Sequence, residues 1–197
     1  MPGAMVELTP ITTEIAFSIT QHEFKDGEVT RKFCIATYSP ISPESLEIIS
    51  RAITALHTTE GSGSTPYYNA TAQSVIASLK EASIVMIAST NLADYEQPIG
   101  YALLGPPCPQ TDECREIGIM VGRDFRNKSV AKQMFLALLN QAQPLGVSTC
   151  RADFSTSNKS VWRLLRTAES AGLIYYVTKI DGSDTAAQIV VRTPQIA

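Results

Sequence analysis

The chain has 197 residues, of which 18% are charged, and its formal net charge at pH 7 is −3. This length fits one domain with a substantial core, and the acidic balance argues against a nucleic-acid-binding surface. The sequence has no apolar run long enough to cross a bilayer and no secretory signal at its start, so we expect a cytoplasmic protein that does not bind membranes.

The first half of the chain predicts a hairpin, two helices and two further strands. Lys25-Asp26-Gly27-Glu28 joins the hairpin, because Asp-Gly between two β-prone runs favours a tight turn. Ser42 as N-cap and Pro43 at the first position open the first helix. The Gly/Ser-rich run Thr58–Thr65 predicts a loop, and Gly105-Pro106-Pro107 predicts a break after the last strand. The elements are, in order, strands Glu14–Phe24 and Val29–Tyr38, a helix from Pro43 with a stripe at Leu46, Ile49, Ile53 and Leu56, a helix Tyr67–Lys80, and strands Ser83–Thr90 and Gln97–Leu104.

The second half alternates strands and helices. Helices between strands imply an α/β layer architecture with some parallel pairing, whereas the strands between residues 83 and 121 imply an antiparallel portion. Pro144 and Gly146 end the first of these helices, and Gly172 ends the second. The predicted elements are strand Ile117–Val121, helix Ser129–Gln143, strand Val147–Phe154, helix Asn158–Ala171, and strands Ile174–Ile180 and Ala187–Arg192.

Four cysteines, at positions 34, 108, 114 and 150, form no CxxC pair, and the chain has two histidines. A zinc site is therefore not expected. Cys108 and Cys114 flank a proline-rich loop and could meet, but the missing secretory signal favours free thiols.

The segment Glu116–Phe135 carries the strongest functional signal. Its strand ends in a short basic turn that leads directly into a helix, whose first N–H groups have no acceptor within the helix. The helix dipole favours negative charge there, and Arg126, Lys128 and Lys132 add cations. The segment therefore predicts a site for a pyrophosphate-bearing ligand; the alternative is a solvated basic turn.

Two motifs in this order resemble the GNAT superfamily of acyl-CoA N-acyltransferases. Its phosphate-binding signature, Arg/Gln-x-x-Gly-x-Gly/Ala, is matched by Arg126-Asn127-Lys128-Ser129-Val130-Ala131, with Ser129 in place of a glycine. The second motif is an Asn that opens a helix ending at Gly, here Asn158 to Gly172. The longer run from Glu116 to Ala131 is most similar to the ribosomal-protein N-terminal acetyltransferase type.

The resemblance implies a mixed α/β fold with a mostly antiparallel, splayed central sheet and helices on both faces. Residues 33–197 would form the acyltransferase domain, with residues 1–32 as an N-terminal extension, including the first hairpin strand, packed on it. The partner would be an amine acceptor, either a protein or a small molecule. Because many relatives dimerise, the chain could also form a homodimer.

The resemblance also implies acetyl-CoA or coenzyme A as co-substrate, without a metal. The strand backbone would pair with pantetheine, the loop amides would hold the pyrophosphate, and Asn158 would hydrogen-bond pantetheine or the acyl end. The residues assigned to the cofactor are Ile119, Met120, Val121, Arg126, Asn127, Lys128, Ser129, Val130, Ala131, Lys132, Asn158 and Arg163.

Acetyl transfer needs a base for the amine proton and an acid for the leaving thiol. Glu116 is the candidate base, and the alternative is a solvated carboxylate at a strand end. Leu165 stands where many family members have a proton-donating tyrosine. Tyr175 or Tyr176 could replace it, although packing with a wet hydroxyl is the alternative.

The region between the first two helices lines the acceptor pocket in this family, which assigns Glu60, Tyr67 and Tyr68 to substrate binding; a surface loop is the alternative. His57 is interpreted as a partner of a helix C-terminus. The leading hypothesis is an acetyl-CoA-dependent N-acetyltransferase. The alternatives are a catalytically impaired acyl-CoA-binding sensor or scaffold of the same fold, and an unrelated α/β domain for another phosphate ligand.

Overall fold

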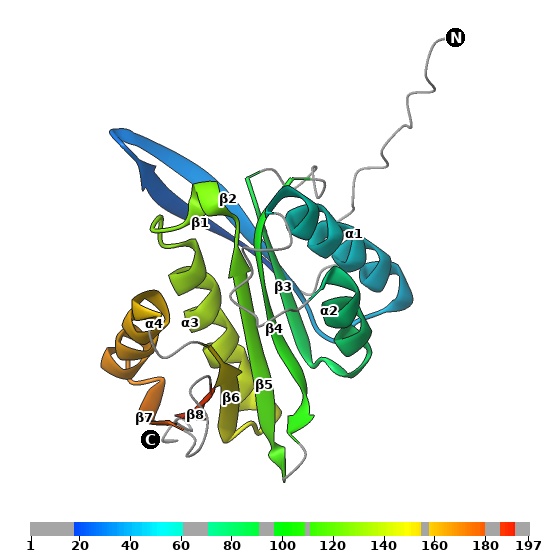
Figure 1. Cartoon of the computed structure of the whole chain (residues 1–197), viewed down its shortest axis with the longest axis vertical. Helices are drawn as coiled ribbons and strands as arrows, with labels where there is room; N and C mark the ends of the chain where they lie inside the picture. Colours follow the sequence, from blue (N-terminus) through cyan, green and yellow to red (C-terminus); the bar gives the residue numbers. More distant parts are fainter. Residues whose placement is uncertain are drawn as a thin grey trace.

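The computed structural model describes residues 18–60, 71–90, 97–108, 111–154, 158–179 and 186–191. Within them, eight strands form one sheet in the order β1-β2-β3-β4-β5-β6-β8-β7 (Figure 1). The strands are β1 (Ser18–Asp26), β2 (Val29–Tyr38), β3 (Ile84–Ser89), β4 (Pro98–Cys108), β5 (Thr111–Val121), β6 (Thr149–Asp153), β7 (Ile174–Lys179) and β8 (Ala186–Val191). The α-helices are α1 (Pro43–Glu60), α2 (Ala72–Ser78), α3 (Val130–Ala142) and α4 (Lys159–Ser170), and the 3₁₀ segments are η1 (Leu79–Glu81), η2 (Arg123–Phe125) and η3 (Gln143–Leu145).

The sheet is mostly antiparallel and is splayed between β5 and β6. Among the described strands, only this pair is parallel, and its register covers Cys114–Glu116 against Thr149–Arg151. β5 continues to Val121 while remaining paired with β4 on its other edge. The mixed, mostly antiparallel and splayed sheet predicted from the sequence is confirmed.

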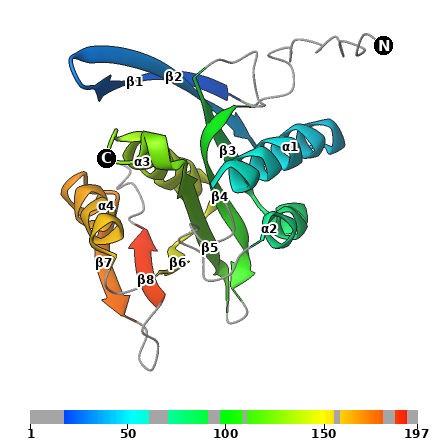
Figure 2. The ribbon, with the colours of Figure 1, turned by 45° about the horizontal axis from the view of Figure 1, so that its top comes forward.

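Helices cover both faces of the sheet, with α1 and α2 on one side and α3 and α4 on the other (Figures 1 and 2). Alternating side chains of the central strands supply the two cores, as the period of a strand requires. On β5, Ile117 and Val121 join the α3–α4 core, whereas Met120 joins the α1–α2 core. Each large apolar side chain buried in this way contributes roughly 1.5–3 kcal/mol to folding.

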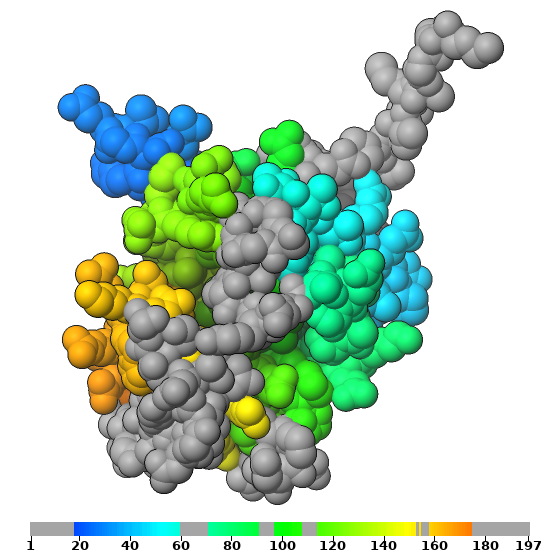
Figure 3. All heavy atoms as spheres, viewed as in Figure 1, coloured from blue at the N-terminus to red at the C-terminus, as the bar shows by residue number. Residues whose placement is uncertain are grey.

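The β1–β2 hairpin projects beyond the rest of the sheet (Figures 1 and 3). Its register closes at Asp26 opposite Val29. Gly27 in the turn has φ +63°, a conformation that glycine adopts without steric cost. The predicted Asp-Gly turn is therefore confirmed. β2 runs from residue 29 to residue 38 without interruption, and the division of the chain at residue 32 stays a prediction.

Side chains cap the N-termini of α1 and α4, and the cap at Ser42 of α1 was predicted from the sequence. The Ser45 amide donates to Ser42 Oγ over 3.2 Å at α1. Asn158 Oδ1 accepts from the first amides of α4, and Gly172 with φ +73° follows its C-terminus. Polar side chains that accept from the first turn stabilise a helix by about 1 kcal/mol.

Two helix boundaries differ from the prediction. α1 continues to Glu60, through the start of the predicted Gly/Ser loop. The helix tolerates Thr58 because its hydroxyl donates to a carbonyl one turn back, at 2.8 Å. α2 begins only at Ala72, since Thr71 is its N-cap and its Oγ1 accepts from Ser74 N at 3.1 Å. The predicted start of this helix at Tyr67 lies outside the described residues.

The predicted break after β4 is also wrong. The strand continues through Gly105, Pro106 and Pro107 to Cys108, and β5 already begins at Thr111. The pairing shifts register between Leu104 and Pro107, which is how a strand accommodates residues that cannot donate to the ladder. The long β4–β5 pairing therefore overrides the local preference of the proline pair.

The cysteine side chains that the structure describes divide into two kinds. Cys114 is disulfide-bonded, contrary to the expectation that all four thiols are free. Cys34 and Cys150 are free and buried, and burial raises the pKa of the Cys150 thiol to about 12. Neither free thiol is therefore poised to act as a nucleophile.

Candidate functional site

The segment between β5 and α3 forms a loop of unusual backbone conformation. β5 ends at Val121, the η2 turn follows, and Asn127 and Ser129 then take positive φ values of 61° and 65°. A serine in this left-handed conformation costs about 1–2 kcal/mol, and Asn tolerates it better. Ser129 occupies the position where the motif normally has glycine. Backbone strain of this kind concentrates at binding and catalytic sites.

The N-terminus of α3 is not capped by a side chain. Within the described residues, Ser129 stands at the N-cap position but makes no side-chain capping hydrogen bond. The first helical hydrogen bond runs from Gln133 N to Ser129 O, at 3.0 Å. The amides of residues 130–132 therefore have no acceptor inside the helix and point outward at its positive end. This arrangement suits an anion such as a phosphate.

Arg126 ties the loop to the end of the preceding strand. Its Nε donates to Val121 O at 3.1 Å, while its backbone N–H donates to Arg123 O at 3.2 Å. The side chain is exposed. Its guanidinium therefore lies beside the end of β5, next to the loop that leads into α3.

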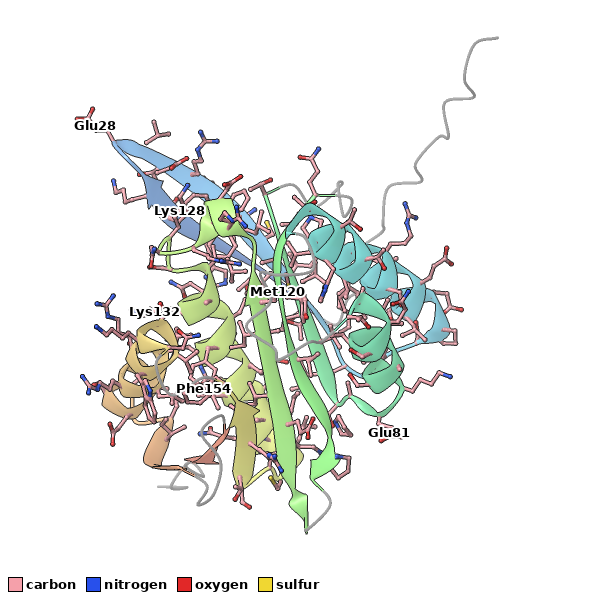
Figure 4. The ribbon with its side chains drawn as sticks, in the orientation of Figure 1. Glu28, Glu81, Met120, Lys128, Lys132 and Phe154 are labelled. Atoms are coloured by element: carbon pink, nitrogen blue, oxygen red, sulfur yellow. The ribbon has the colours of Figure 1, made fainter. Side chains whose placement is uncertain are left out.

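The side chain of Lys128 points toward the β1–β2 hairpin. Its Nζ lies 2.7 Å from Asp26 Oδ1 on the hairpin and 5.6 Å and 5.8 Å from the ring centroids of Phe24 and Phe125. Figure 4 shows Lys128 next to the hairpin and Lys132 farther along α3, on the side of α4. Lys132 is exposed in the first turn of the helix. The charge of Lys128 is thus offset by a carboxylate, and its backbone remains in the loop.

The end of β5 offers an edge to an extended ligand. The β5–β6 register stops at Glu116, so the two strands diverge on the side that contains the three residues assigned to pantetheine. Ile119 is half-buried and packs with Val121 against the α3–α4 core, whereas Met120 is buried on the opposite face. The backbone of these residues, rather than their side chains, is the feature that could pair with a ligand.

The start of α4 places the second motif. Asn158 Oδ1 accepts from Ser160 N at 3.2 Å and from Val161 N at 3.3 Å, so only its Nδ2 could donate to a ligand without breaking the cap. Arg163 is exposed on the outer face of the helix. Leu165 is 3% exposed and belongs to the α3–α4 core, where it has no proton to donate.

Glu116 lies on the α1–α2 face of the sheet. It shares this face with Gly118 and Met120 because side chains two positions apart on a strand point the same way, and a Cβ built on Gly105 of β4 would lie 3.5 Å from Glu116 Cβ. The carboxylate-bearing residue is exposed. It therefore lies on the face of the sheet opposite α3, and its role as a base stays a prediction.

Several predicted residues lie where their side chains are outside the described part of the structure. Tyr175 and Tyr176 belong to β7, and Glu60 is the last residue of α1. Tyr67 and Tyr68 lie outside the described residues altogether. Their catalytic and substrate-binding roles stay predictions.

One pair of chemically active side chains was not predicted. His57, in the last turn of α1, hydrogen-bonds Tyr101 of β4 with 3.2 Å between Nε2 and the hydroxyl oxygen. The rings stack with 6.0 Å between centroids. Burial lowers the pKa of His57 and raises the pKa of Tyr101, so both are neutral near pH 7. Tyr101 pairs with Met120 of β5, which puts this pair on the same face as Glu116.

A hollow of about 350 Å³ lies between the hairpin and the loop before α3. Its lining residues are Glu23, Phe24, Lys25, Thr30, Asn127, Lys128 and Ser129. The space-filling view shows the hairpin beside the segment that follows β5 (Figure 3). The sequence carried no signal for this contact, because the hairpin and the loop are about a hundred positions apart.

Comparison with known proteins identifies the family. The model of the acetyltransferase (GNAT) domain matches residues 8–169, and the chain therefore belongs to the GNAT acetyltransferases. The predicted resemblance is confirmed. Members of this family are acyltransferases that bind acetyl-CoA or coenzyme A. No curated protein sequence matches the chain significantly.

Solved structures show the same fold. A GNAT acetyltransferase from Streptococcus pneumoniae is 11% identical with a TM-score of 0.54, and 81% of this chain covers 98% of that one. A ribosomal-protein-S5-alanine acetyltransferase from Vibrio fischeri is 8% identical with a TM-score of 0.54, covering 89% of this chain and 98% of that one. The ribosomal-protein-S18-alanine N-acetyltransferase from Escherichia coli is 13% identical with a TM-score of 0.52, covering 83% and 98%. At such identities the likeness concerns the fold.

None of the helices in the described ranges is long and apolar enough to span a membrane. No group of three or more His, Cys, Asp or Glu side chains among the described residues is arranged to hold a metal ion.

Proposed function

We propose that this GNAT protein is an N-acetyltransferase that moves an acetyl group from acetyl-CoA directly to a primary amine. The observation that carries the proposal is the uncapped N-terminus of α3, preceded by a loop with two left-handed residues and placed where the sheet splays. This arrangement presents free amide donors to an anion at the end of an open strand edge.

The donors present fit coenzyme A. The amides of residues 130–132 would bind the pyrophosphate, with Arg126 and Lys132 as the neighbouring cations. Lys128 contributes its backbone rather than its charge, since its ammonium group is paired with Asp26. The backbone of Ile119–Val121 would pair with the pantetheine arm in the manner of an added strand. Asn158 Nδ2 and Arg163 would meet the cofactor from α4.

The chemistry requires an amine proton to leave as the new bond forms. Bound acetyl-CoA supplies a thioester, whose C–S bond breaks as the C–N bond to the amine forms, releasing the thiol. On the protein side, positioning supplies much of the acceleration, and a base takes the amine proton. Glu116 is the proposed base, and Tyr175 or Tyr176 the proposed donor to the departing sulfur.

His57 is a second base to be compared with Glu116. Its lowered pKa keeps the imidazole neutral near pH 7 and therefore able to accept a proton, and Tyr101 fixes its orientation. The variants Glu116→Gln and His57→Gln distinguish the two. If Glu116 is the base, only its variant loses most of the turnover rate at unchanged affinity for acetyl-CoA. A loss confined to His57→Gln would transfer the role.

The acceptor would approach from the α1–α2 face, with Glu60, Tyr67 and Tyr68 as its proposed contacts. Protein N-termini, lysines, polyamines and amino sugars all present the required primary amine. We also propose that the protein is cytoplasmic. A separate proposal is that it assembles as a homodimer.

Calorimetry with acetyl-CoA and coenzyme A, followed by a thiol-release assay over a panel of amines, tests the function. We expect both compounds to bind at micromolar concentrations and at least one amine to release thiol. If neither compound binds at high micromolar concentration, the proposed function is wrong.

A CoA-binding sensor or scaffold of the same fold is the second candidate. One observation favours it: Leu165, at the position of the usual acid, is buried in the core and cannot donate a proton. Binding of acetyl-CoA without thiol release across the whole panel would support this second function.

A further inference from the structure

The β1–β2 hairpin makes a specific contact with the loop before α3. Asp26 at the end of β1 accepts from Lys128 Nζ at 2.7 Å through one oxygen and faces Arg31 Nε at 2.9 Å through the other. The rings of Phe24 and Phe125 meet edge to face, with 6.0 Å between centroids. Two hairpin residues therefore contact two residues of the loop, and one of the contacts is charge-assisted.

Left-handed backbone at residues other than glycine persists only where surrounding contacts hold it, and the loop before α3 contains two such residues. Asn127 and Ser129, the two residues with positive φ, lie on either side of Lys128. The strained backbone on both sides of Lys128 fixes the direction in which its side chain leaves the loop. Conversely, a partner that binds this side chain opposes relaxation of both strained residues. The hairpin supplies that partner in Asp26.

We propose that Asp26 is a positioning residue for the cofactor, which holds the loop at residues 126–129 in its phosphate-binding conformation through Lys128. This inference rests on the proposed function and adds to it a role for the hairpin. Asp26 itself touches no cofactor in this account. Its contribution is the preorganisation of the loop amides, which reduces the entropy lost on binding.

Electrostatics alone predicts the opposite effect, and this makes the proposal testable. Asp26 carries a negative charge close to a site for an anion, and the hydrogen bond from Lys128 lowers its pKa, so it stays charged under assay conditions. Removing that charge and releasing Lys128 would strengthen the binding of coenzyme A if Coulomb attraction dominated. Loss of preorganisation would weaken it.

The experiment compares Asp26→Asn with two matched variants in calorimetric titration with coenzyme A. Glu23→Gln removes the same charge from the same strand, and Arg31→Gln removes the other partner of Asp26 while leaving Lys128 in contact. We expect about fivefold weaker binding for Asp26→Asn and less than about twofold change for both controls. Unchanged or tighter binding by Asp26→Asn overturns the proposal.

A second readout needs no ligand. Hydrogen exchange of the amides in residues 126–132 of the free protein should accelerate about tenfold in Asp26→Asn relative to both controls, with the midpoint of thermal unfolding nearly unchanged. In a Ser129→Gly background the Asp26→Asn effect should shrink, since glycine adopts positive φ without strain. Equal exchange in all variants overturns the positioning role. If the wild type binds no coenzyme A, the proposed function fails while the exchange data still decide the role of Asp26.

Discussion

The N-termini of α3 and α4 follow the two strands that diverge, β5 and β6, but are built in opposite ways. α4 begins at Asn158, whose side chain satisfies two amides of the first turn. α3 begins at Ser129, which adopts φ +65° and, in the part of the chain that the structure describes, makes no side-chain cap. One helix end is completed by the protein itself, and the other is left with its donors available.

The difference has an energetic meaning. A side-chain cap stabilises a helix by about 1 kcal/mol, and a left-handed serine costs about 1–2 kcal/mol. α3 lacks the stabilisation of a side-chain cap and carries the strain of the left-handed serine. An Asn like the one that caps α4 would also satisfy the amides of α3, but Ser129 does not do so. We infer that the N-terminus of α3 is left uncapped so that it can bind an external anion. Because GNAT proteins bind coenzyme A, we propose that this anion is the pyrophosphate of coenzyme A.

The largest expected effect comes from placing a carboxylate at the open helix end. Ser129→Asp would put a negative charge where the pyrophosphate is proposed to bind, and its oxygen would compete for the same amides. We expect coenzyme A to bind at least about 100-fold more weakly by calorimetry. The matched change Asn158→Asp at α4 removes only the Nδ2 donor proposed to meet the cofactor, so its loss of affinity should stay below about tenfold. Equal losses in both variants would remove the distinction between the two helix ends.

The next effect concerns the arginines near each helix. Arg126→Ala removes a cation beside the α3 loop and the hydrogen bond from Nε to Val121 O. We expect about tenfold weaker binding of coenzyme A, because a charge-assisted contact to phosphate is lost. Arg163→Ala, on the exposed face of α4, should cost about twofold to threefold. Unchanged affinity in Arg126→Ala contradicts the proposed phosphate site.

Substitutions at the two helix N-termini should rank in the opposite order when stability, rather than affinity for coenzyme A, is measured. Asn158→Ala deletes a cap and should lower the free energy of unfolding by about 1 kcal/mol. Ser129→Ala deletes no cap and keeps the same strained backbone, so its expected change is below about 0.5 kcal/mol. Urea denaturation followed by circular dichroism measures both. A loss in Ser129→Ala as large as in Asn158→Ala would show that Ser129 caps α3 after all.

Ser129→Gly should stabilise the protein slightly. Glycine relieves the left-handed strain but gains conformational freedom in the unfolded chain, and the two terms partly cancel. We expect a net gain of about 0.5 kcal/mol in the free energy of unfolding, from the same denaturation curves. A loss of stability on this change would mean that the backbone at Ser129 is not strained in solution.

The smallest expected effect is the dependence of stability on pH, to which neither Ser129 nor Asn158 contributes a titrating group. Burial lowers the pKa of His22 and His57 in the folded protein. Below pH 6.5 the unfolded chain therefore binds more protons than the folded one, and stability falls as pH decreases. Well above pH 6.5 both histidines are neutral in the folded and the unfolded chain, so they add nothing to the pH dependence of stability. The double variant His22→Gln, His57→Gln should flatten thermal unfolding midpoints between pH 5 and pH 7, whereas a steeper slope would contradict this account.

Local signals account for what the sequence predicted correctly. The Asp26-Gly27 turn, the cap at Ser42, and the helices that follow Ser129 and Asn158 each depend on residues within a few positions of one another. The succession of strand, turn and helix around residues 117–142 was predictable for the same reason, since these elements are consecutive, whereas phosphate binding by this loop stays a prediction.

Non-local contacts account for what the sequence could not predict. Lys128 lies 102 positions from Asp26, and His57 lies 44 positions from Tyr101, so no local pattern joins either pair. The continuation of β4 through Pro107 has the same cause, because pairing with β5 overrides the local preference for a break. Lys128 was assigned to phosphate binding from its place in the motif, whereas the partner of its side chain is Asp26 of the β1–β2 hairpin.

The most direct test of the central claim is an NMR titration of the ¹⁵N-labelled protein with coenzyme A. We predict that the largest amide shifts fall at residues 127–132, at the start of α3, and that those at residues 159–161 of α4 are smaller. Larger shifts at the start of α4 than at the start of α3, or a loop before α3 that does not respond to saturating coenzyme A, would contradict the account.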